Sequence, residues 1–459
     1  MSDSTFGYLT PENLSLFTDL YELRMMQGFY LQDHNPTASF SLFFRELPEH
    51  RGYMIAAGLE QVLAYIEDLQ FTPRTIDYLA EQGFDPSFLE YLRSFEFTGS
   101  IRAVPEGTPI FADEPIVEVT GPIIQGQLLE TLIINQIGFQ TLIATKAARM
   151  LDVIDRSGSG QQLVDFGSRR AHGTDGGIKA ARAAYLGGFD GTSNVAAGEL
   201  FNIPVVGTMA HSWIQSFPDE REAYETFLEE YGENSILLID TYDTLEGARL
   251  TKEILEDRSD LENIAGVRLD SGDLVGLSRD VNEILPETDQ YISSGMDEYS
   301  IAEFLDNGGI GVGFGPGTSL VTSADAPTGE CVYKLVAVDQ NGKLEPTMKM
   351  STGKVTYPGE KSLRRITEND GFSHDVVGLR DEDLPGKELL QPVVAEGEII
   401  YDIPALDTIK ENARSNRQNI PVPHRKIREP EPYPVIISTG LQTMTDELQS
   451  ELEAKHPSS

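Results

Sequence analysis

Apolar residues recur along this chain with two different periods, and the pattern changes near residue 160. Before that point we predict helices in residues 9–30, 53–69, 86–95 and 127–154 and strands in residues 40–47 and 97–123. Pro11 and Glu12 suit the first turn of the first helix. The last helical stretch is apolar enough to form one or two buried helices. This part of the chain is therefore expected to be α+β.

After residue 160 the chain alternates between short apolar runs and helical stretches, and each run ends in Gly, Ser, Asp or Arg. The runs are QQLVDFGSRR, GGFDGTSN, IPVVGTMAHSW, SILLIDTYDT, IAGVRLDSGDL, QYISSGMD and GIGVGFGPGT. Strands that alternate with helices form parallel sheets. Seven such units without a dinucleotide-binding fingerprint favour a β/α barrel, here incomplete. The chemistry of such barrels lies where the strands end.

These patterns predict an α/β fold with three parts. Residues 1–125 would form an N-terminal α+β sandwich domain, and residues 126–323 an irregular, incomplete β/α barrel. Residues 324–459 would form a C-terminal extension that starts with the strand-like CVYKLVAV, partly returns to the sandwich and ends in an acidic helical tail.

Composition narrows the class of protein. The 459 residues carry 35 Lys and Arg against 74 Asp and Glu, a net charge of -39. That charge argues against nucleic-acid binding, which needs cations to replace phosphate counterions. Acidic residues spread along the whole chain, with few lysines, resemble the composition of proteins from halophiles. High salt there screens the repulsion between the acidic side chains, so an anionic ligand would have to be bound by short-range groups. Without an apolar run of membrane length, a secretory signal or a second cysteine beside Cys331, we expect a cytoplasmic protein without membrane contact.

Two neighbouring turns rich in Gly and Ser are candidates for phosphate binding. GVGFGPGTSL ends a strand and offers Gly317 and Thr318 at a helix start, and YISSGMDE offers Ser294 and Gly295 one unit earlier. Backbone N–H groups in such turns bind phosphate, and β/α barrels commonly carry a phosphate site after their last strands. A tight structural turn is the alternative for each motif alone.

Charged residues follow several strands. VRLDSGDL places Arg268, Asp270 and Asp273 at one strand end, and LLIDTYDT does the same for Asp240 and Asp243. An Arg fork can bind phosphate or carboxylate, and the carboxylates can bind ribose hydroxyls or hydrated magnesium. The alternative to ligand binding is an ion pair between Arg268 and Asp270 at the rim of the barrel, with a structural role only.

Two further strand ends carry cationic or titratable side chains. DFGSRRAHG places Arg169, Arg170 and His172 beside Phe166, which indicates an anion subsite or, alternatively, a salt-bridged surface pair. GTMAHSW places His211 just after a strand, where it could be a base, a ligand, a nucleophile or a structural histidine.

Taken together, the motifs resemble the nicotinate phosphoribosyltransferases. The matching motifs are TDLYEL, DFGSRRAHG, GTSNVAAG, VVGTMAHS, LIDTYDT, VRLDSGD, GFGPGTSLVTS and KMSTGKVTYPG, which run in the family's order from residue 18 to residue 359. No motif of the family is found in residues 380–459. The resemblance implies a type II phosphoribosyltransferase fold and a homodimer with shared active sites. It also implies synthesis of nicotinate mononucleotide and pyrophosphate from nicotinate and phosphoribosyl pyrophosphate for NAD salvage, driven by ATP as co-substrate and requiring Mg²⁺.

The resemblance also implies roles for individual residues. The catalytic group would be His211, Arg268, Asp270 and Asp240, with His211 transiently phosphorylated by ATP and the two aspartates near ribose or Mg²⁺. Substrates would be bound by Asp19, Tyr21, Phe166, Arg169, Ser193, Ser294, Gly295, Gly317, Thr318 and Lys349. Tyr21 from the second subunit would stack on the pyridine ring opposite Phe166, the glycine turns would hold the 5′-phosphate, and Lys349 would reach the diphosphate.

Two alternatives to this function stay open. The nicotinamide phosphoribosyltransferases have an Asp where this chain has Ser193; a carboxylate would repel nicotinate, whereas a hydroxyl can donate to its carboxylate, so nicotinate is favoured. The other alternative is a non-catalytic β/α barrel that binds a phosphorylated ligand, with His211 in a structural role.

Overall fold

The computed structural model describes residues 7, 9–258, 261, 263–349, 356–369 and 371–455 of the chain. It divides into two compact units: the first comprises residues 1–142 and 328–459, the second residues 143–327. The boundaries predicted from the sequence, after residues 125 and 323, fall 17 and four residues earlier. No helix in the described part of the chain combines the length and apolarity needed to cross a lipid bilayer.

The first unit is built on a seven-stranded sheet of order β13-β12-β1-β5-β3-β17-β18 and a four-stranded sheet of order β16-β14-β15-β19. Its strands are β1 Thr37–Phe44, β2 Met54–Ile55, β3 Ser100–Ala103, β4 Pro109–Ile110, β5 Val117–Pro122, β12 Cys331–Gln340, β13 Lys343–Pro346, β14 Lys361–Glu368, β15 Gly371–Leu379, β16 Lys387–Glu388, β17 Gln391–Ala395, β18 Glu398–Ile399 and β19 Val435–Ile437. N-terminal and C-terminal strands thus share one sheet, since β1 pairs with β5 on one side and β12 on the other.

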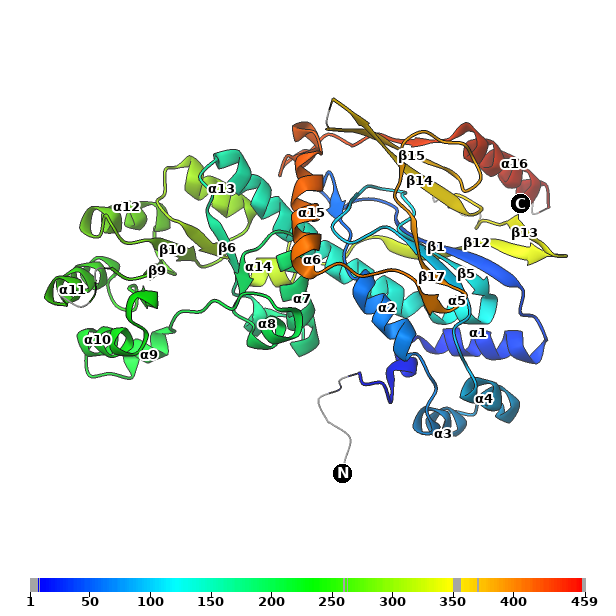
Figure 1. Cartoon of the computed structure of the whole chain (residues 1–459), viewed down its shortest axis with the longest axis horizontal. Coiled ribbons are helices and arrows are strands. Elements are labelled where there is room, and N and C mark those ends of the chain that lie inside the picture. The colour runs from blue at the N-terminus through cyan, green and yellow to red at the C-terminus, as the bar shows by residue number, and fades with distance from the viewer. Residues whose placement is uncertain are drawn as a thin grey trace. The chain divides into compact units, whose positions relative to one another are not determined.

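The helices of the first unit surround its two sheets, and α16 packs on β15 of the four-stranded sheet (Figure 1). They are α1 Leu20–Leu31, α2 Leu59–Asp68, α3 Pro73–Glu81, α4 Pro86–Arg93, α5 Ile123–Leu128, α15 Leu406–Gln418, α16 Thr439–Lys455 and the start of α6 Glu130–Ser157. Thr72 and Asp85 accept hydrogen bonds from the first turns of α3 and α4, and a proline follows each cap, which fits a helix start.

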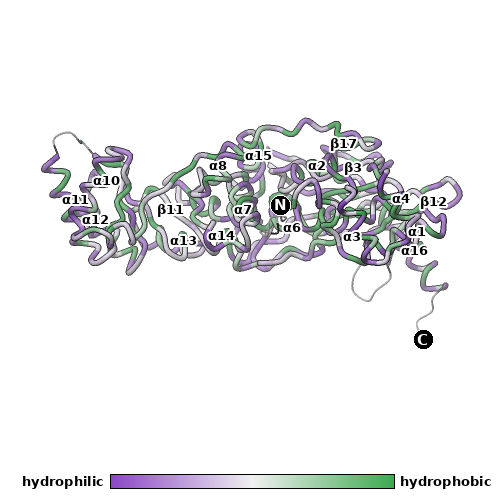
Figure 2. The backbone as a smooth tube through the Cα atoms, turned by 90° about the horizontal axis from the view of Figure 1, so that it is seen from below, coloured by the Kyte–Doolittle hydropathy of each residue, from purple (hydrophilic) through white to green (hydrophobic). Residues whose placement is uncertain are grey.

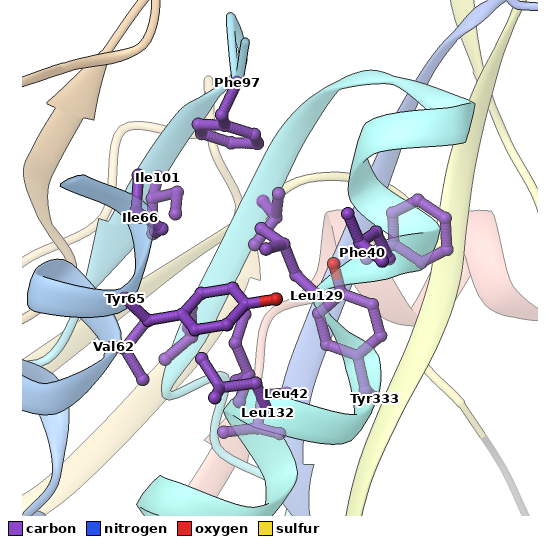
Figure 3. Packing of buried hydrophobic residues seen from close by; sticks show 14 of the residues in the cluster. Phe40, Leu42, Val62, Tyr65, Ile66, Phe97, Ile101, Leu129, Leu132 and Tyr333 are labelled. Carbon is purple, nitrogen blue, oxygen red and sulfur yellow. The ribbon is translucent and has the colours of Figure 1, made fainter. Parts of the chain in front are cut away.

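The core of the first unit joins segments far apart in the sequence. Phe40 of β1 stacks on Tyr333 of β12, with ring centroids 5.0 Å apart, in the same buried cluster as Val62 and Ile66 of α2 (Figure 3). The Tyr333 hydroxyl donates to the carbonyl of Gly126, at 2.8 Å, so the buried ring leaves no unsatisfied polar group at its tip.

Two helix starts predicted from the sequence are wrong. The first helix begins at Leu20, because Asn13 closes a turn at Thr10 and residues Leu14–Leu16 form a short 3₁₀ helix instead. The second begins at Leu59 and not at residue 53, because β2 pairs with β4 and Gly58 has a φ of 100°, a backbone conformation outside the right-handed helix.

The second unit is built on a parallel sheet of order β7-β6-β11-β10-β9-β8. Its strands are β6 Gln162–Asp165, β7 Gly191–Thr192, β8 Ile236–Leu238, β9 Gly266–Leu269, β10 Gln290–Ser293 and β11 Gly313–Gly315. In the sequence β6 is the first of these strands and β11 the last, and the two pair with each other, so the sheet curls into a half-barrel. Seven apolar runs were predicted to form strands. The run around Val205 makes only an isolated bridge to Thr192 and does not form a strand.

Helices follow the strands and lie beside this sheet (Figure 1). They are the remainder of α6, α7 Thr174–Leu186, α8 Val195–Phe201, α9 His211–Gln215, α10 Glu220–Tyr231, α11 Thr244–Asp257, α12 Leu274–Ile284, α13 Glu298–Asp306 and α14 Thr318–Val321. Hydrophilic and hydrophobic residues alternate along α10 to α12 (Figure 2). In α11 the buried positions include Ala248, Thr251 and Ile254, the spacing of a helix with one face on the sheet.

Candidate active site

A pocket of about 250 Å³ opens in the second unit where β6, β9, β10 and β11 end. It is lined by Phe166, Arg169, Arg170, Arg268, Asp270, Ser293, Ser294, Gly295, Gly315, Gly317 and Thr318. Because these strands are parallel, their carboxyl ends lie at one edge of the sheet, where ligands bind in α/β proteins. Most of the substrate-binding and catalytic residues predicted for this unit therefore share one pocket.

Arg268 is held in this pocket by four neighbours. Its Nε donates to the Ser293 hydroxyl at 2.8 Å, and its Nη1 donates to the Thr208 hydroxyl at 3.1 Å. Its Nη2 lies 3.1 Å from Oδ1 of Asp270, and its guanidinium carbon lies 5.4 Å from the centroid of the Phe166 ring. The rim ion pair considered from the sequence is thus present, and it orients a planar cation at the wall of the pocket.

Phe166 is placed by the backbone of two strands. Its N–H donates to the carbonyl of Pro316, and a Cβ at Gly315 would lie 2.4 Å from its ring, so only glycine leaves room for the ring there. The preceding carboxylate of Asp165 accepts from Gly167 N–H at 2.7 Å and from the Thr192 hydroxyl at 2.8 Å. Burial raises the pKa of Asp165 and these hydrogen bonds oppose the shift.

His211 and two carboxylates form a cluster at the edge of the pocket. Nε2 of His211, the first residue of α9, lies 3.8 Å from Oδ2 of Asp270, and Nδ1 lies 3.1 Å from the Thr241 hydroxyl. Asp240 Oδ2 accepts from the Asp270 N–H at 2.9 Å and from the Ser271 hydroxyl at 2.6 Å. The imidazole is therefore held at Nδ1 by Thr241, and its Nε2 lies near a carboxylate that lines the pocket.

The carboxylates fit a magnesium ion that keeps most of its water. Asp240 Oδ1 is buried without a hydrogen-bond partner among the described residues, so a hard acceptor atom is left for a cation or its hydration shell. The described residues contain no group of three or more His, Cys, Asp or Glu side chains able to hold a metal ion. Such a site would suit Mg²⁺, which binds through one or two carboxylates together with substrate phosphates.

The two glycine turns meet at the pocket. Ser294 and Gly295 have φ angles of 82° and 65°, and both residues are exposed. The Ser319 hydroxyl donates to the carbonyl of Met296 and so connects this turn to the turn of Gly317 and Thr318. Turns of this kind expose backbone N–H groups, which can bind an anion.

Arg169 and Arg170 add positive charge to the pocket. They form a short 3₁₀ helix after β6 and are exposed. The described residues form no ion pair with either arginine, so they give no support to the alternative of a salt-bridged surface pair. Two exposed cations with no ion pair to the described carboxylates, in so acidic a chain, fit an anionic ligand.

Like His211 and Asp240, four further candidates of this unit lie outside the pocket lining: His172, Ser193, Asp243 and Asp273. Ser193 follows β7, and its N–H donates to the carbonyl of Asp165 at 2.8 Å. Asp243 and Asp273 accept hydrogen bonds from the first turns of α11 and α12, so they are helix caps.

The candidates Asp19, Tyr21 and Lys349 belong to the first unit. Asp19 precedes α1 and accepts from the Thr131 hydroxyl at 2.8 Å, and Tyr21 is half-exposed in the first turn of that helix. Lys349 is exposed, and residues 350–355 of its motif lie outside the described residues.

Sequence reasoning missed three hydroxyl residues that orient the site. The Thr208 hydroxyl bonds to Arg268, and the Thr241 hydroxyl bonds to His211. The Ser293 hydroxyl lies between Arg268 and Asp270 and bonds to both. Their shared signal is a hydroxyl within three residues of a predicted strand end, which is common in loops and identifies a site only once its partners are known.

The fold and the pocket place this chain in a class of α/β proteins. Their parallel half-barrel sheet carries a cationic, glycine-lined anion site at the carboxyl ends of its strands. The chain belongs to the nicotinate phosphoribosyltransferase family. Models of that family's N-terminal domain, of the family itself and of its C-terminal domain match residues 16–138, 161–376 and 379–445. The last match assigns residues 379–445, where no motif of the family was found from the sequence, to the family's C-terminal domain.

Relatives agree over nearly the whole chain. A nicotinate phosphoribosyltransferase of Mycobacterium tuberculosis is 42% identical, covering 92% of this chain and 91% of the relative, and that of Bacillus subtilis is 37% identical, covering 93% of each. The crystal structure of human nicotinic acid phosphoribosyltransferase superposes with a TM-score of 0.82 at 27% identity, covering 94% of this chain and 99% of the human one.

Proposed function

We propose that this protein is an ATP-coupled nicotinate phosphoribosyltransferase that makes nicotinate mononucleotide and pyrophosphate from nicotinate and phosphoribosyl pyrophosphate in NAD salvage. A bond forms between the pyridine nitrogen and C1 of ribose, while the bond from C1 to the diphosphate oxygen breaks and pyrophosphate leaves with its electrons. The observation that carries the proposal is the cationic pocket of Arg169, Arg170 and Arg268 at the strand ends of a chain with a net charge of -39.

The pocket offers separate groups for the two anionic substrates. Arg268 is fixed in orientation, so it can grip a phosphate or carboxylate with two N–H groups. Arg169 would bind the other anion, and the turns at Ser294, Gly295, Gly317 and Thr318 would hold the 5′-phosphate through backbone N–H groups. Phe166 would stack on the pyridine ring.

Residues of the first unit would complete the site in a homodimer. Tyr21 of a second copy would stack on the pyridine ring opposite Phe166, with Asp19 beside it in the same motif. Lys349 would reach the diphosphate. Support for these assignments comes from the motif matches and from the exposure of Tyr21 and Lys349.

Displacement at C1 separates charge, because the ribose becomes cationic as pyrophosphate departs. The chain's task is to hold the two reactants in line and to stabilise that charge with fixed dipoles and cations, which requires no protein nucleophile at carbon. Asp270 and Asp240 would bind the ribose hydroxyls or Mg²⁺, and that ion supplies charge neutralisation of the diphosphate when bound.

His211 is proposed to couple ATP to this reaction. A ring nitrogen would attack the γ-phosphorus of ATP, a nitrogen–phosphorus bond would form, and ADP would leave; water later releases phosphate. The added charge beside Asp270 would change the relative affinities for substrates and products, and each tenfold change corresponds to about 1.4 kcal/mol. The fixed position of the imidazole between Thr241 and Asp270 supports this role.

The test is pyrophosphate release from nicotinate, phosphoribosyl pyrophosphate, ATP and Mg²⁺, with nicotinamide and quinolinate in parallel reactions. The reactions are run in molar KCl, because the acidic chain is proposed to be adapted to high salt. We expect release with nicotinate and much less with nicotinamide. Release with nicotinamide alone would establish the alternative transferase, and no release with any pyridine would establish a non-catalytic binder.

A further inference from the structure

A buried ion cluster lies in the second unit and has no role in the mechanism above. Lys146 of α6 lies 2.6 Å from Oε2 of Glu298 and 2.7 Å from Oδ1 of Asp325. Arg149, one turn later on α6, lies 2.9 Å from Oε1 of Glu298 and donates to the Tyr299 hydroxyl at 3.0 Å. The side chains of Lys146, Arg149 and Glu298 are at most 2% exposed.

Both carboxylates of this cluster follow a turn of the pocket. Glu298 is the first residue of α13 and comes three residues after Gly295. Asp325 comes seven residues after Thr318, beyond the short helix α14. The two turns are also connected by the Ser319 hydroxyl, which donates to Met296. One ammonium group therefore ties together the chain segments that leave the two turns.

The turns need such support. Ser294 is a non-glycine residue with a φ of 82°, which is costly for an L-residue and persists only where neighbouring structure enforces it. The capping box of α13, in which Asp297 accepts from the Tyr299 and Ser300 N–H groups, fixes the helix start but not its position relative to α14. Lys146 supplies that connection, because it pairs with Glu298 of α13 and with Asp325 beyond α14, and Arg149 holds Glu298 in place.

We propose that Lys146, Glu298 and Asp325, with Arg149, are positioning residues that hold the turns at Ser294–Gly295 and Gly317–Thr318 in register to bind the 5′-phosphate of phosphoribosyl pyrophosphate. This inference rests on the proposed function for the identity of the phosphate. None of these four residues lines the pocket, and they act through the two turns.

The test compares Glu298→Gln, Asp325→Asn and Lys146→Arg in the full chain. Glu298→Gln and Asp325→Asn keep the side-chain shape and remove a charge, so we expect the KM for phosphoribosyl pyrophosphate to rise about tenfold while the KM for nicotinate changes less than twofold. Lys146→Arg keeps a cation between the two carboxylates and should retain most of the affinity. Asp375→Asn, which breaks the buried ion pair with Arg365 in the first unit, is the matched control for lost stability.

Hydrogen exchange gives a second measurement that needs no catalysis. Amides of residues 293–297 and 317–320 should exchange faster in Glu298→Gln than in the parent protein, while those of α7 stay unchanged. The proposal would be overturned if the KM values for phosphoribosyl pyrophosphate and nicotinate changed by the same factor, exchange in both turns stayed unchanged and the unfolding temperature fell. The cluster would then only stabilise the fold. If the parent protein makes no nucleotide but the exchange differs as expected, the proposed function fails and the positioning role stands.

Discussion

Nε2 of His211 lies 3.8 Å from Oδ2 of Asp270, so the histidine and the strand-end carboxylate form one unit of the site. The same aspartate pairs with Arg268 through Oδ1, at 3.1 Å. A change of charge on the imidazole is therefore felt directly by the residue that orients the pocket arginine. This arrangement makes His211 the first residue to test.

We expect His211→Ala to abolish ATP hydrolysis and its coupling and to leave some uncoupled nucleotide synthesis, because the pocket that holds the two substrates remains. ADP formation and nucleotide synthesis are measured in the same reactions. His34→Ala, at an exposed histidine after α1, is the control and should behave as the parent protein. Normal stimulation of synthesis by ATP in His211→Ala would refute the coupling role.

Ser193 is expected to favour nicotinate over nicotinamide. Ser193→Asp places a carboxylate after β7 that would repel nicotinate and accept from an amide, so the ratio of kcat/KM for nicotinate to that for nicotinamide should fall about tenfold or more. Ser159→Asp adds the same charge to the exposed loop before the amino end of β6 and serves as the control. An unchanged ratio in Ser193→Asp would count against the selectivity argument.

Much of the site could be predicted from the sequence because parallel topology brings strand ends together. Arg268, Asp270 and Gly317 are up to 49 residues apart in the sequence, yet all line one pocket. The apolar runs identify the strands, and the residue after each run is then placed at a common edge without further information. The same reasoning places Phe166 and Arg169 correctly.

Other features depended on contacts that no local pattern contains. Asp243 and Asp273 are helix caps although they stand beside Asp240 and Asp270, because an aspartate after a strand suits both a cap and a site. The pairing of β17 with β3 joins residues almost 290 positions apart, and the register is set by tertiary packing. The run at Val205 has strand composition but makes only one bridge.

Glu22 should make stability depend on pH. Its side chain is buried and accepts from Nε2 of Gln127, and burial raises its pKa from 4.5 to about 7. Between pH 4.5 and pH 7 the carboxyl of Glu22 keeps its proton in the folded chain and loses it in the unfolded chain. The free energy of unfolding therefore falls as the pH rises through this range, and Glu22 causes no further change above about pH 7.

Glu22→Gln should remove this dependence. Between pH 5 and pH 8 we expect the variant to gain about 2 kcal/mol of unfolding free energy relative to the parent protein. Denaturant unfolding at constant ionic strength measures the difference. Glu67→Gln, at an exposed position of α2, is the control and should run parallel to the parent protein. A parallel pH profile for Glu22→Gln as well would show that Glu22 is ionised in the folded protein throughout this range.

Arg268 tests whether orientation or charge alone binds the anion. Arg268→Lys keeps the positive charge but cannot bond at once to Ser293, Thr208 and Asp270, and it loses the planar contact with Phe166. We expect the KM for phosphoribosyl pyrophosphate to rise at least about tenfold, the effect of losing about 1.4 kcal/mol of binding. Ser293→Ala, which removes only the hydroxyl between Arg268 and Asp270, should give a smaller rise in the same direction. Wild-type kinetics in Arg268→Lys would mean that a mobile point charge is sufficient, and the fixed guanidinium would then have no part in binding.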